Sequence, residues 1–186
     1  HPDEKLKAAY ALEGETDFFH PMLLMESVRL ASRITGIRAT EDLHDLGRTI
    51  SAFYAALAVS LMVVVGWLAG GITAAWLVAA LASLSHFNLA LAHYMKEDTA
   101  LLFGLALASL AMALHLRHPR PALHCFLGAA CAVALSGKYV GALILLFALP
   151  VLFQPDTSRG GSRCRRASWF LLGLVPSLLI INHAAL

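Results

Sequence analysis

The stretch TISAFYAALAVSLMVVVGWLAGGITAAWLVAALASLSHFNLALAHYM, residues 49–95, contains no Asp, Glu, Lys or Arg. It is 47 residues long, and a hydrocarbon core about 30 Å thick is crossed by about 20 helical residues. The stretch is therefore long enough for two membrane spans. Gly70 and Gly71 stand near its middle, and glycine readily adopts the backbone angles of a tight turn. We expect a helical hairpin that turns at this pair.

The composition of the whole chain also indicates a bilayer. Of its 186 residues 59% are hydrophobic and only 14% are charged, with a mean hydropathy of +0.70, whereas a soluble domain carries about 25% charged residues. This apolar content excludes intrinsic disorder, and three cysteines, which we expect to be free thiols, exclude a disulfide scaffold. A net charge of only +2, with basic residues scattered between apolar blocks, argues against nucleic-acid binding.

Further uncharged stretches predict an all-α, polytopic transmembrane helix bundle. The fourth and fifth stretches are shorter than a full crossing, so they fit either two short or tilted helices or one re-entrant pair. The chain starts at His1 and stops within an apolar run at Leu186, which indicates a fragment of a larger protein. We predict six spans, at about 49–68, 72–92, 99–116, 122–136, 139–153 and 169–186.

Two basic loops predict the orientation of the bundle. Arg117 and Arg120 lie between the third and fourth spans, and four arginines fall within residues 159–166, so the positive-inside rule places both loops in the cytoplasm. The Gly70 turn then lies inside as well, and residues 1–48 lie outside. This arrangement puts 11 of the 12 acidic residues on the outer side, although most of them are also explained by the tolerance of outer loops for acids.

The first 48 residues differ from the remainder, so we divide the chain into an outer loop, 1–48, and a transmembrane bundle, 49–186. The loop mixes acidic residues with large apolar ones, as amphipathic helices on a membrane surface do. His20-Pro21 can begin such a helix, and 22–35 is helix-compatible and ends near Gly36. The alternative is a surface loop with a solvated charged face.

Three places carry residues suited to chemistry, all on the predicted outer side. They are Asp3-Glu4, Lys96-Glu97-Asp98 and Lys138-Tyr139. A carboxylate at a membrane interface is costly to desolvate, so it is usually paired or lines a watery cavity. Asp98 has an alternative explanation as a helix N-cap, since Asp98-Thr99 precedes an apolar run; a cap can also point into a site.

The histidines and other polar residues of the spans have simpler explanations. We interpret His86 and Asn88 as interhelical hydrogen-bonding partners. His93, near Asp98, is kept as a candidate that contacts the site residues and supports them. The remaining histidines of this region accompany two arginines, which favours contact with anionic headgroups, and their spacing gives no support for zinc. They are His115, His118 and His124.

The order of motifs along the chain resembles the GT-C glycosyltransferases, and most closely the branch of dolichyl-phosphate-mannose protein mannosyltransferases and bacterial aminoarabinose or mannosyl transferases. The resemblance covers nearly the whole chain. Its motifs are Asp3-Glu4 in the first loop, His20-Pro21 before a juxtamembrane helix, GRTIS at 47–51, HYMKED at 93–98 and SGKYVG at 136–141.

This resemblance implies a multi-pass enzyme, expected in a bacterial inner membrane, that takes a sugar from a polyprenyl-phosphate donor on the outer face. Its catalytic carboxylates match Asp3, with Glu4 in support, and a second acidic motif matches Glu97 and Asp98. The carrier phosphate would meet Lys138, Lys96 or Arg48, in that order. Only one proline follows His20, where the family usually shows two. The remaining substrate-binding candidates are His20, His93 and Tyr139.

These residue types suit the expected reaction. A carboxylate can remove the acceptor's proton and stabilise oxocarbenium character, and a departing phosphate needs positive charge, supplied by Lys, Arg or a divalent ion. Magnesium or manganese held by Asp3, Glu4, Glu97 and Asp98 is one possibility, and a site without metal is the other.

The acceptor, a protein, lipid or glycan, and the sugar stay open. The competing class is a transporter or flippase of lipid-linked intermediates, or a non-catalytic membrane subunit. Transporters usually have ionisable residues inside their spans and internal repeats. Here the long spans contain no charged residue and the chain has no evident repeat.

Overall fold

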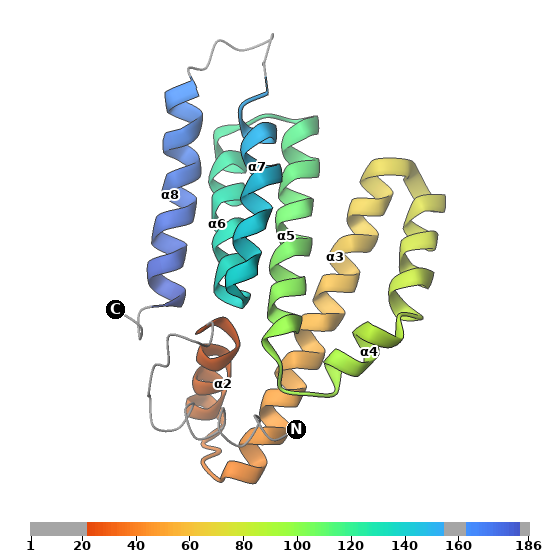
Figure 1. Ribbon diagram of the computed structural model, residues 1–186, viewed down its shortest axis with the longest axis vertical. Helices are drawn as coiled ribbons and strands as arrows, with labels where there is room; N and C mark the ends of the chain where they lie inside the picture. Colours follow the sequence, from red (N-terminus) through yellow and green to blue (C-terminus); the bar gives the residue numbers. More distant parts are fainter. Residues whose placement is uncertain (1–21, 155–162, 183–186) are drawn as a thin grey trace.

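The computed structural model describes residues 22–154 and 163–182, and throughout them the chain forms helices joined by short loops. Figure 1 shows the helices arranged as an elongated bundle. The predicted all-α bundle is confirmed. Its elements are α2 (Met22–Thr35), α3 (Thr40–Ser83), α4 (His86–Ala92), α5 (Glu97–Arg117), α6 (Pro121–Gly137), the 3₁₀ helix η1 (Tyr139–Ile144), α7 (Leu145–Leu152) and α8 (Arg163–Ile181).

Helix α3 is a hairpin of two helical legs that turns where the sequence predicts. Gly70 and Gly71 leave helical geometry, and Gly71 has φ +71°, in the left-handed region that glycine enters without a steric cost. In Figure 1 the first leg runs along the bundle to the turn and the second leg returns beside it. The hairpin prediction is therefore confirmed.

The second leg does not continue to residue 92 as one span, so that part of the prediction is wrong. Helix α3 ends at Ser83, and α4 begins after Ser85, whose hydroxyl accepts a hydrogen bond from the Asn88 N–H at 3.3 Å. A serine hydroxyl offers the backbone an alternative partner to the helical carbonyl and thereby favours a new helix start. The segment predicted as the second span, 72–92, therefore consists of the second leg of α3 followed by the short helix α4.

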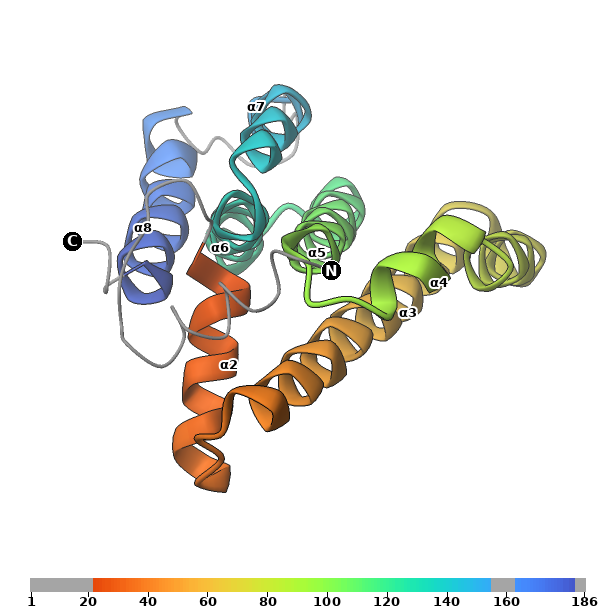
Figure 2. The same cartoon turned by 60° about the horizontal axis from the view of Figure 1, so that its bottom comes forward.

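The other helices run back and forth along the bundle. Figure 2 shows α6 between α5 and α8, with α7 beside α5 and α6. Helix α6 is about 25 Å long, and η1 with α7 is about 24 Å long, from their rises per residue. The fourth and fifth stretches are thus two short helices that run in opposite directions. The last helix starts at Arg163 instead of residue 169, because its arginines extend the helix beyond the apolar run.

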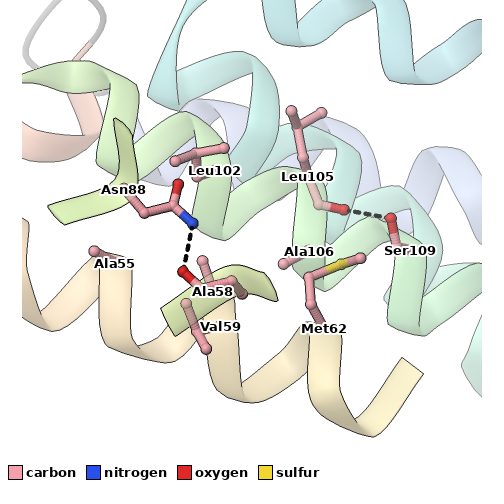
Figure 3. Close-up of a pocket in the computed structure, with 10 residues that line it drawn as sticks. Ala55, Ala58, Val59, Met62, Asn88, Leu102, Leu105, Ala106 and Ser109 are labelled. Carbon is pink, nitrogen blue, oxygen red and sulfur yellow. Dashed lines mark hydrogen bonds between the residues drawn. The ribbon is translucent and has the colours of Figure 1, made fainter. Parts of the chain in front are cut away.

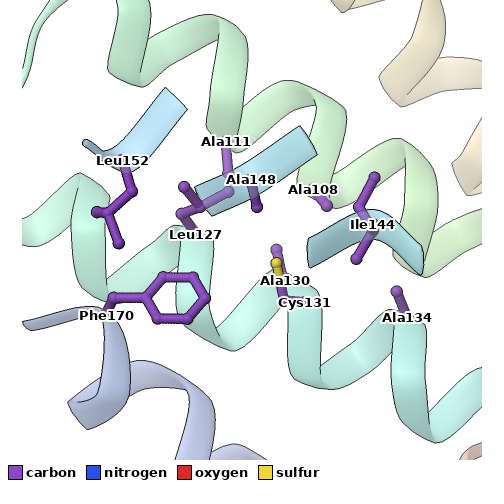
Figure 4. Packing of buried hydrophobic residues seen from close by; sticks show 10 residues of the cluster. All are labelled: Ala108, Ala111, Leu127, Ala130, Cys131, Ala134, Ile144, Ala148, Leu152 and Phe170. Carbon is purple, nitrogen blue, oxygen red and sulfur yellow. The ribbon is translucent and has the colours of Figure 1, made fainter. Parts of the chain in front are cut away.

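Small residues allow the central helices to approach closely. A Cβ atom on Gly173 would meet the Cys125 carbonyl group of α6, and one on Gly128 would meet the Phe170 carbonyl oxygen of α8. Glycine and alanine at such contacts are how membrane helices gain van der Waals packing. Figure 4 shows the buried cluster between these helices: Ala108, Ala111, Leu127, Ala130, Cys131, Ala134, Ile144, Ala148, Leu152 and Phe170.

The outside of the bundle is covered by large apolar side chains, which identifies it as membrane-embedded. Trp76 is 71% exposed and Leu81 is 73% exposed, and a soluble monomer rarely exposes such a continuous apolar surface. By length and composition α3, α5 and α8 can each cross a bilayer, while α6 and the η1–α7 segment are shorter apolar helices.

Helix α2 docks at one end of the bundle. Its bounds match the predicted helix, and Gly36 with φ +76° follows its end. Its Ser27 hydroxyl donates to the Leu23 carbonyl (2.7 Å) and therefore accepts from the Tyr54 hydroxyl of α3 (2.6 Å). The apolar contacts of α2 belong to a second buried cluster: Leu24, Met25, Val28, Leu43, Met95 and Ala100.

The opposite end, which we call the basic end, gathers the α3 turn, the α5–α6 loop and the start of α8 (Figure 1). Arg117 donates a hydrogen bond to the Leu68 carbonyl oxygen, so the α3 turn and the α5–α6 loop are neighbours. The predicted grouping of these loops on one side is thus confirmed.

Two histidines near the basic end are not at a headgroup surface. His115 and His124 are 3% and 5% exposed, and their ring centroids lie 4.7 Å apart between α5 and α6. The headgroup interpretation is therefore wrong for this pair, because facing positions of adjacent antiparallel helices bury both rings. His118 is exposed.

Candidate functional site

At the α2 end, which comprises α2, the first turn of α5 and the last turn of α6, the structure joins two of the predicted site residues. The Lys138 ammonium group lies 2.7 Å from Asp98 Oδ1, although the residues are 40 positions apart. Helices α5 and α6 are consecutive and antiparallel, so the start of one lies beside the end of the other. Gly137 allows the close approach: a Cβ atom there would lie 2.6 Å from the Leu101 nitrogen.

Each charge of this pair stands at the helix end that stabilises it. Asp98 is in the first turn of α5, where the helix dipole is positive, and Lys138 directly follows α6, where the dipole is negative. The side chains are 30% and 43% exposed, respectively. The ammonium group of Lys138 is therefore held in place and still accessible from outside the bundle.

The N-cap prediction for Asp98 is wrong, because α5 starts two residues earlier. Lys96 is the N-cap, with extended backbone angles, and its carbonyl oxygen accepts hydrogen bonds from the Thr99 N–H (3.3 Å) and the Thr99 hydroxyl (2.9 Å). This bonding fixes the first turn with Glu97 and Asp98 inside it. The Asp98 carboxylate is thereby left to bind Lys138.

The two acidic residues of this turn differ in access. Glu97 is 7% exposed, and its neighbour Asp98 is half-buried. Asp98 and Lys138 are therefore more accessible from outside the bundle than Glu97 is. Lys96 is half-buried beside them.

The structure places three further candidates near this end with less direct contact. Arg48 lies on the first leg of α3, with its guanidinium 3.7 Å from the Asp45 carboxylate. His93 is exposed, and its Nδ1 lies 2.6 Å from the Leu89 carbonyl oxygen, within its own local turn. Tyr139 is 53% exposed at the start of η1.

Asp3, Glu4 and His20 lie outside the described residues, so their roles stay predictions. The same holds for the metal hypothesis, whose four carboxylates include the first two. In the stretches 22–154 and 163–182 there is no group of three or more His, Cys, Asp or Glu side chains that could hold a metal ion. A cation at Asp98 would compete with the ammonium group of Lys138.

Sequence reasoning missed a hydrogen bond that supports this region. Asn182 Nδ2, just past α8, donates to the Ser136 hydroxyl at 2.8 Å. Ser136 precedes Lys138 by two residues, so the bond ties the end of α8 to the last turn of α6. The signal was present, because Ser136 opens the SGKYVG motif, but its partner lies 46 residues away.

An apolar pocket of about 270 Å³ opens between the legs of α3, α4 and α5 (Figure 3). No ionisable residue lines it, so it is not where a proton or a phosphate is handled. Asn88 at its edge donates to the Ala82 carbonyl oxygen at 3.3 Å, a local bond across the break between α3 and α4. The predicted bond from Asn88 to another span stays a prediction. The lining residues are Ala55, Ala58, Val59, Met62, Ala82, Asn88, Leu102, Leu105, Ala106 and Ser109.

A bundle of apolar helices with a partly exposed pair of opposite charges at one end is the architecture of a polytopic membrane protein. The family model for dolichyl-phosphate-mannose-protein mannosyltransferase matches residues 46–159, more than half of the chain. The chain therefore belongs to this family of membrane glycosyltransferases, which confirms the GT-C resemblance. No curated protein and no solved structure matches the chain.

Proposed function

We propose that this chain contributes to a membrane glycosyltransferase that moves a sugar from a polyprenyl-phosphate donor to an acceptor on the outer face. The observation that carries the proposal is the contact between Asp98 and Lys138 at the α2 end. Both residues fall within the family match, 46–159, and both come from motifs that the resemblance singles out.

In this proposal Lys138 binds the carrier phosphate. The departing group is a phosphate whose negative charge grows in the transition state, and an ammonium group at hydrogen-bond distance stabilises that charge. Asp98 acts as a positioning residue: its carboxylate holds the Lys138 Nζ at 2.7 Å. Lys96 and Arg48 add positive charge to the same end.

Proton removal from the acceptor is assigned to Asp3, with Glu4 in support, because the first-loop carboxylates match the family's catalytic position. Glu97, which is 7% exposed, is suited to orienting neighbours rather than meeting the acceptor. His20, His93 and Tyr139 complete the proposed substrate-binding set. Sugar and acceptor are proposed only as classes: a hexose or pentose, and a hydroxyl of a protein, lipid or glycan.

The side of the membrane follows from charge. Arg117, Arg120 and the start of α8 share the basic end, and the positive-inside rule assigns such an end to the cytoplasm. The α2 end, with Asp98 and Lys138, is then the outer end. In this proposal the enzyme works on the outer face of the membrane, which we expect to be a bacterial inner membrane.

The test is sugar transfer by the full-length protein in membranes, with a radiolabelled polyprenyl-phosphate sugar. We expect Lys138→Met to lower kcat/KM about 100-fold, since a charged hydrogen bond is worth about 1.5–3 kcal/mol. We expect Asp98→Asn to lower it about tenfold and Lys138→Arg to restore part of the loss. The matched control is Asp42→Asn, at an exposed carboxylate in the first turn of α3, which should leave kcat/KM unchanged.

Other results would contradict the proposal in different ways. Labelled lipid that crosses the membrane without transfer of its sugar would indicate a flippase. Full activity in both Lys138→Met and Asp98→Asn would show that the pair is structural. Full activity in Asp3→Asn, with Lys138→Met inactive, would support the role of Lys138 in phosphate binding and contradict the role of Asp3 as the base.

A further inference from the structure

A groove of about 250 Å³ lies between α2 and the end of α8, apart from Asp98 and Lys138. It combines two arginines with aliphatic side chains, which is an unusual lining for a surface hollow in this apolar protein. The lining residues are Leu23, Glu26, Ser27, Arg29, Leu30, Arg33, Ile180 and Ile181.

The charges of the groove leave one arginine available. Glu26 accepts a hydrogen bond from the Arg29 guanidinium at 2.7 Å, and the two side chains are 16% and 14% exposed, so their charges largely cancel. Arg33 is exposed and forms no ion pair with any residue that the structure describes. Arg29 and Arg33 are four residues apart on α2, on the same helix face, and Arg29 has N–H groups beyond the one that Glu26 engages. The groove therefore presents a net positive charge and several donors.

The remaining wall of the groove faces the bilayer. Ile180 is 72% exposed and Leu30 is 60% exposed. Ile180 also belongs to the final turn of α8, a helix long and apolar enough to span the membrane. Arginines beside exposed aliphatic side chains at the end of a span lie at headgroup depth.

We propose that this groove binds an anionic glycerophospholipid of the surrounding bilayer. A guanidinium fork matches a phosphate oxygen pair, so Arg33 and the free N–H groups of Arg29 bind the phosphate, while an acyl chain lies along Leu30 and Ile180. The occupant is a bilayer lipid and not the sugar donor, because the groove is lined by the exposed Leu30 and Ile180 and by neither Asp98 nor Lys138. Bound there, the lipid bridges α2 to α8.

The experiment measures lipid binding to the purified full-length protein by native mass spectrometry, with phosphatidylglycerol and phosphatidylcholine of identical chains. We expect the wild type to prefer phosphatidylglycerol about fivefold or more, and Arg33→Gln to weaken its binding about fivefold, the effect of one interfacial arginine. The matched control is Arg38→Gln, at an exposed arginine between α2 and α3 that does not line the groove. It should bind phosphatidylglycerol as the wild type does. Unchanged thermal unfolding of both variants confirms their folding.

Three results would overturn the proposal. Equal binding of the two lipids by the wild type would show that the groove does not select an anionic headgroup. Equal losses in Arg33→Gln and Arg38→Gln would reduce the effect to general surface charge. Displacement of phosphatidylglycerol from the wild type by polyprenyl phosphate in the same binding experiment would reassign the groove to the carrier. Sugar transfer by the wild type is measured separately, so these results do not depend on the proposed activity.

Discussion

The substitution Gly173→Ala adds only one methyl group, but we expect it to destabilise the bundle strongly. Gly173 lies on α8 against α6, where an added Cβ would overlap the Cys125 carbonyl oxygen and lie 3.0 Å from the Ala129 nitrogen. Both obstacles are backbone atoms within a helix, so no side-chain rotation relieves the overlap. Helix α8 has to move away from α6 by more than about 1.5 Å to restore ordinary contact distances.

The cost follows from the packing that this movement breaks. Phe170 of α8 is 4% exposed and packs into the cluster that includes Leu127 and Cys131 of α6 (Figure 4). In a membrane the packing of helices rests on van der Waals contact, and a gap of 0.5–1 Å already forfeits about a quarter to a half of that attraction. Overpacking of a close interface costs about 1–3 kcal/mol, and the lost Phe170 contacts bring our expectation to the upper end, about 3 kcal/mol.

The assay is unfolding in mixed micelles of mild detergent and dodecyl sulphate, followed by circular dichroism. The control is Val175→Leu, which adds a methylene on the exposed side of the same helix, where Val175 is 46% exposed. We expect the control to change the free energy of unfolding by less than about 0.5 kcal/mol. A Gly173→Ala protein as stable as the control would refute the close α6–α8 contact.

Three further experiments test the α3 turn and the two hydrogen bonds that join helices at the α2 end. Gly71→Ala should cost about 1–2 kcal/mol by thermal unfolding, since alanine is strained at φ +71°, and no loss would contradict the positive φ. Tyr54→Phe should cost about 1 kcal/mol and speed proteolysis of α2. On that background Ser27→Ala should add little, whereas a full additive loss would show that the 2.6 Å bond is absent. Asn182→Ala and Ser136→Ala should show a coupling energy of about 0.5–1 kcal/mol in a double-mutant cycle, and a coupling near zero would separate α8 from α6 at this point.

The features predicted correctly from sequence are those that local rules determine. The Gly70-Gly71 turn is dictated by glycine in the middle of an apolar run that is twice the length of a span. Helix α2 ends where Gly36 takes a positive φ. In both cases the deciding residues are neighbours in the chain, so no knowledge of distant contacts was needed.

The errors arise where a local hydrogen bond or a distant neighbour decides. Hydropathy averages over Ser85, whose hydroxyl caps a new helix, α4, by accepting a hydrogen bond from the Asn88 N–H. The burial of His115 and His124 depends on which faces of α5 and α6 meet, and a basic loop beside them in sequence gives no sign of it. The site candidates Asp3 and Glu4 fall outside the described residues and stay untested.

The pair of Asp98 and Lys138 shows how a site at a membrane interface can be inferred from topology before any contact is known. Two consecutive spans of similar length must run antiparallel, so the first turn of one and the last turn of the next lie at the same end. An acid is stabilised at the first place and a base at the second by the helix dipoles. Lipid around the bundle then leaves each charge the other as its nearest partner. In the function proposed above, the carrier phosphate competes with Asp98 for Lys138. A glycosyltransferase therefore needs no charge deep in its spans to bind an anionic carrier, which is the distribution that this chain shows in residues 49–95.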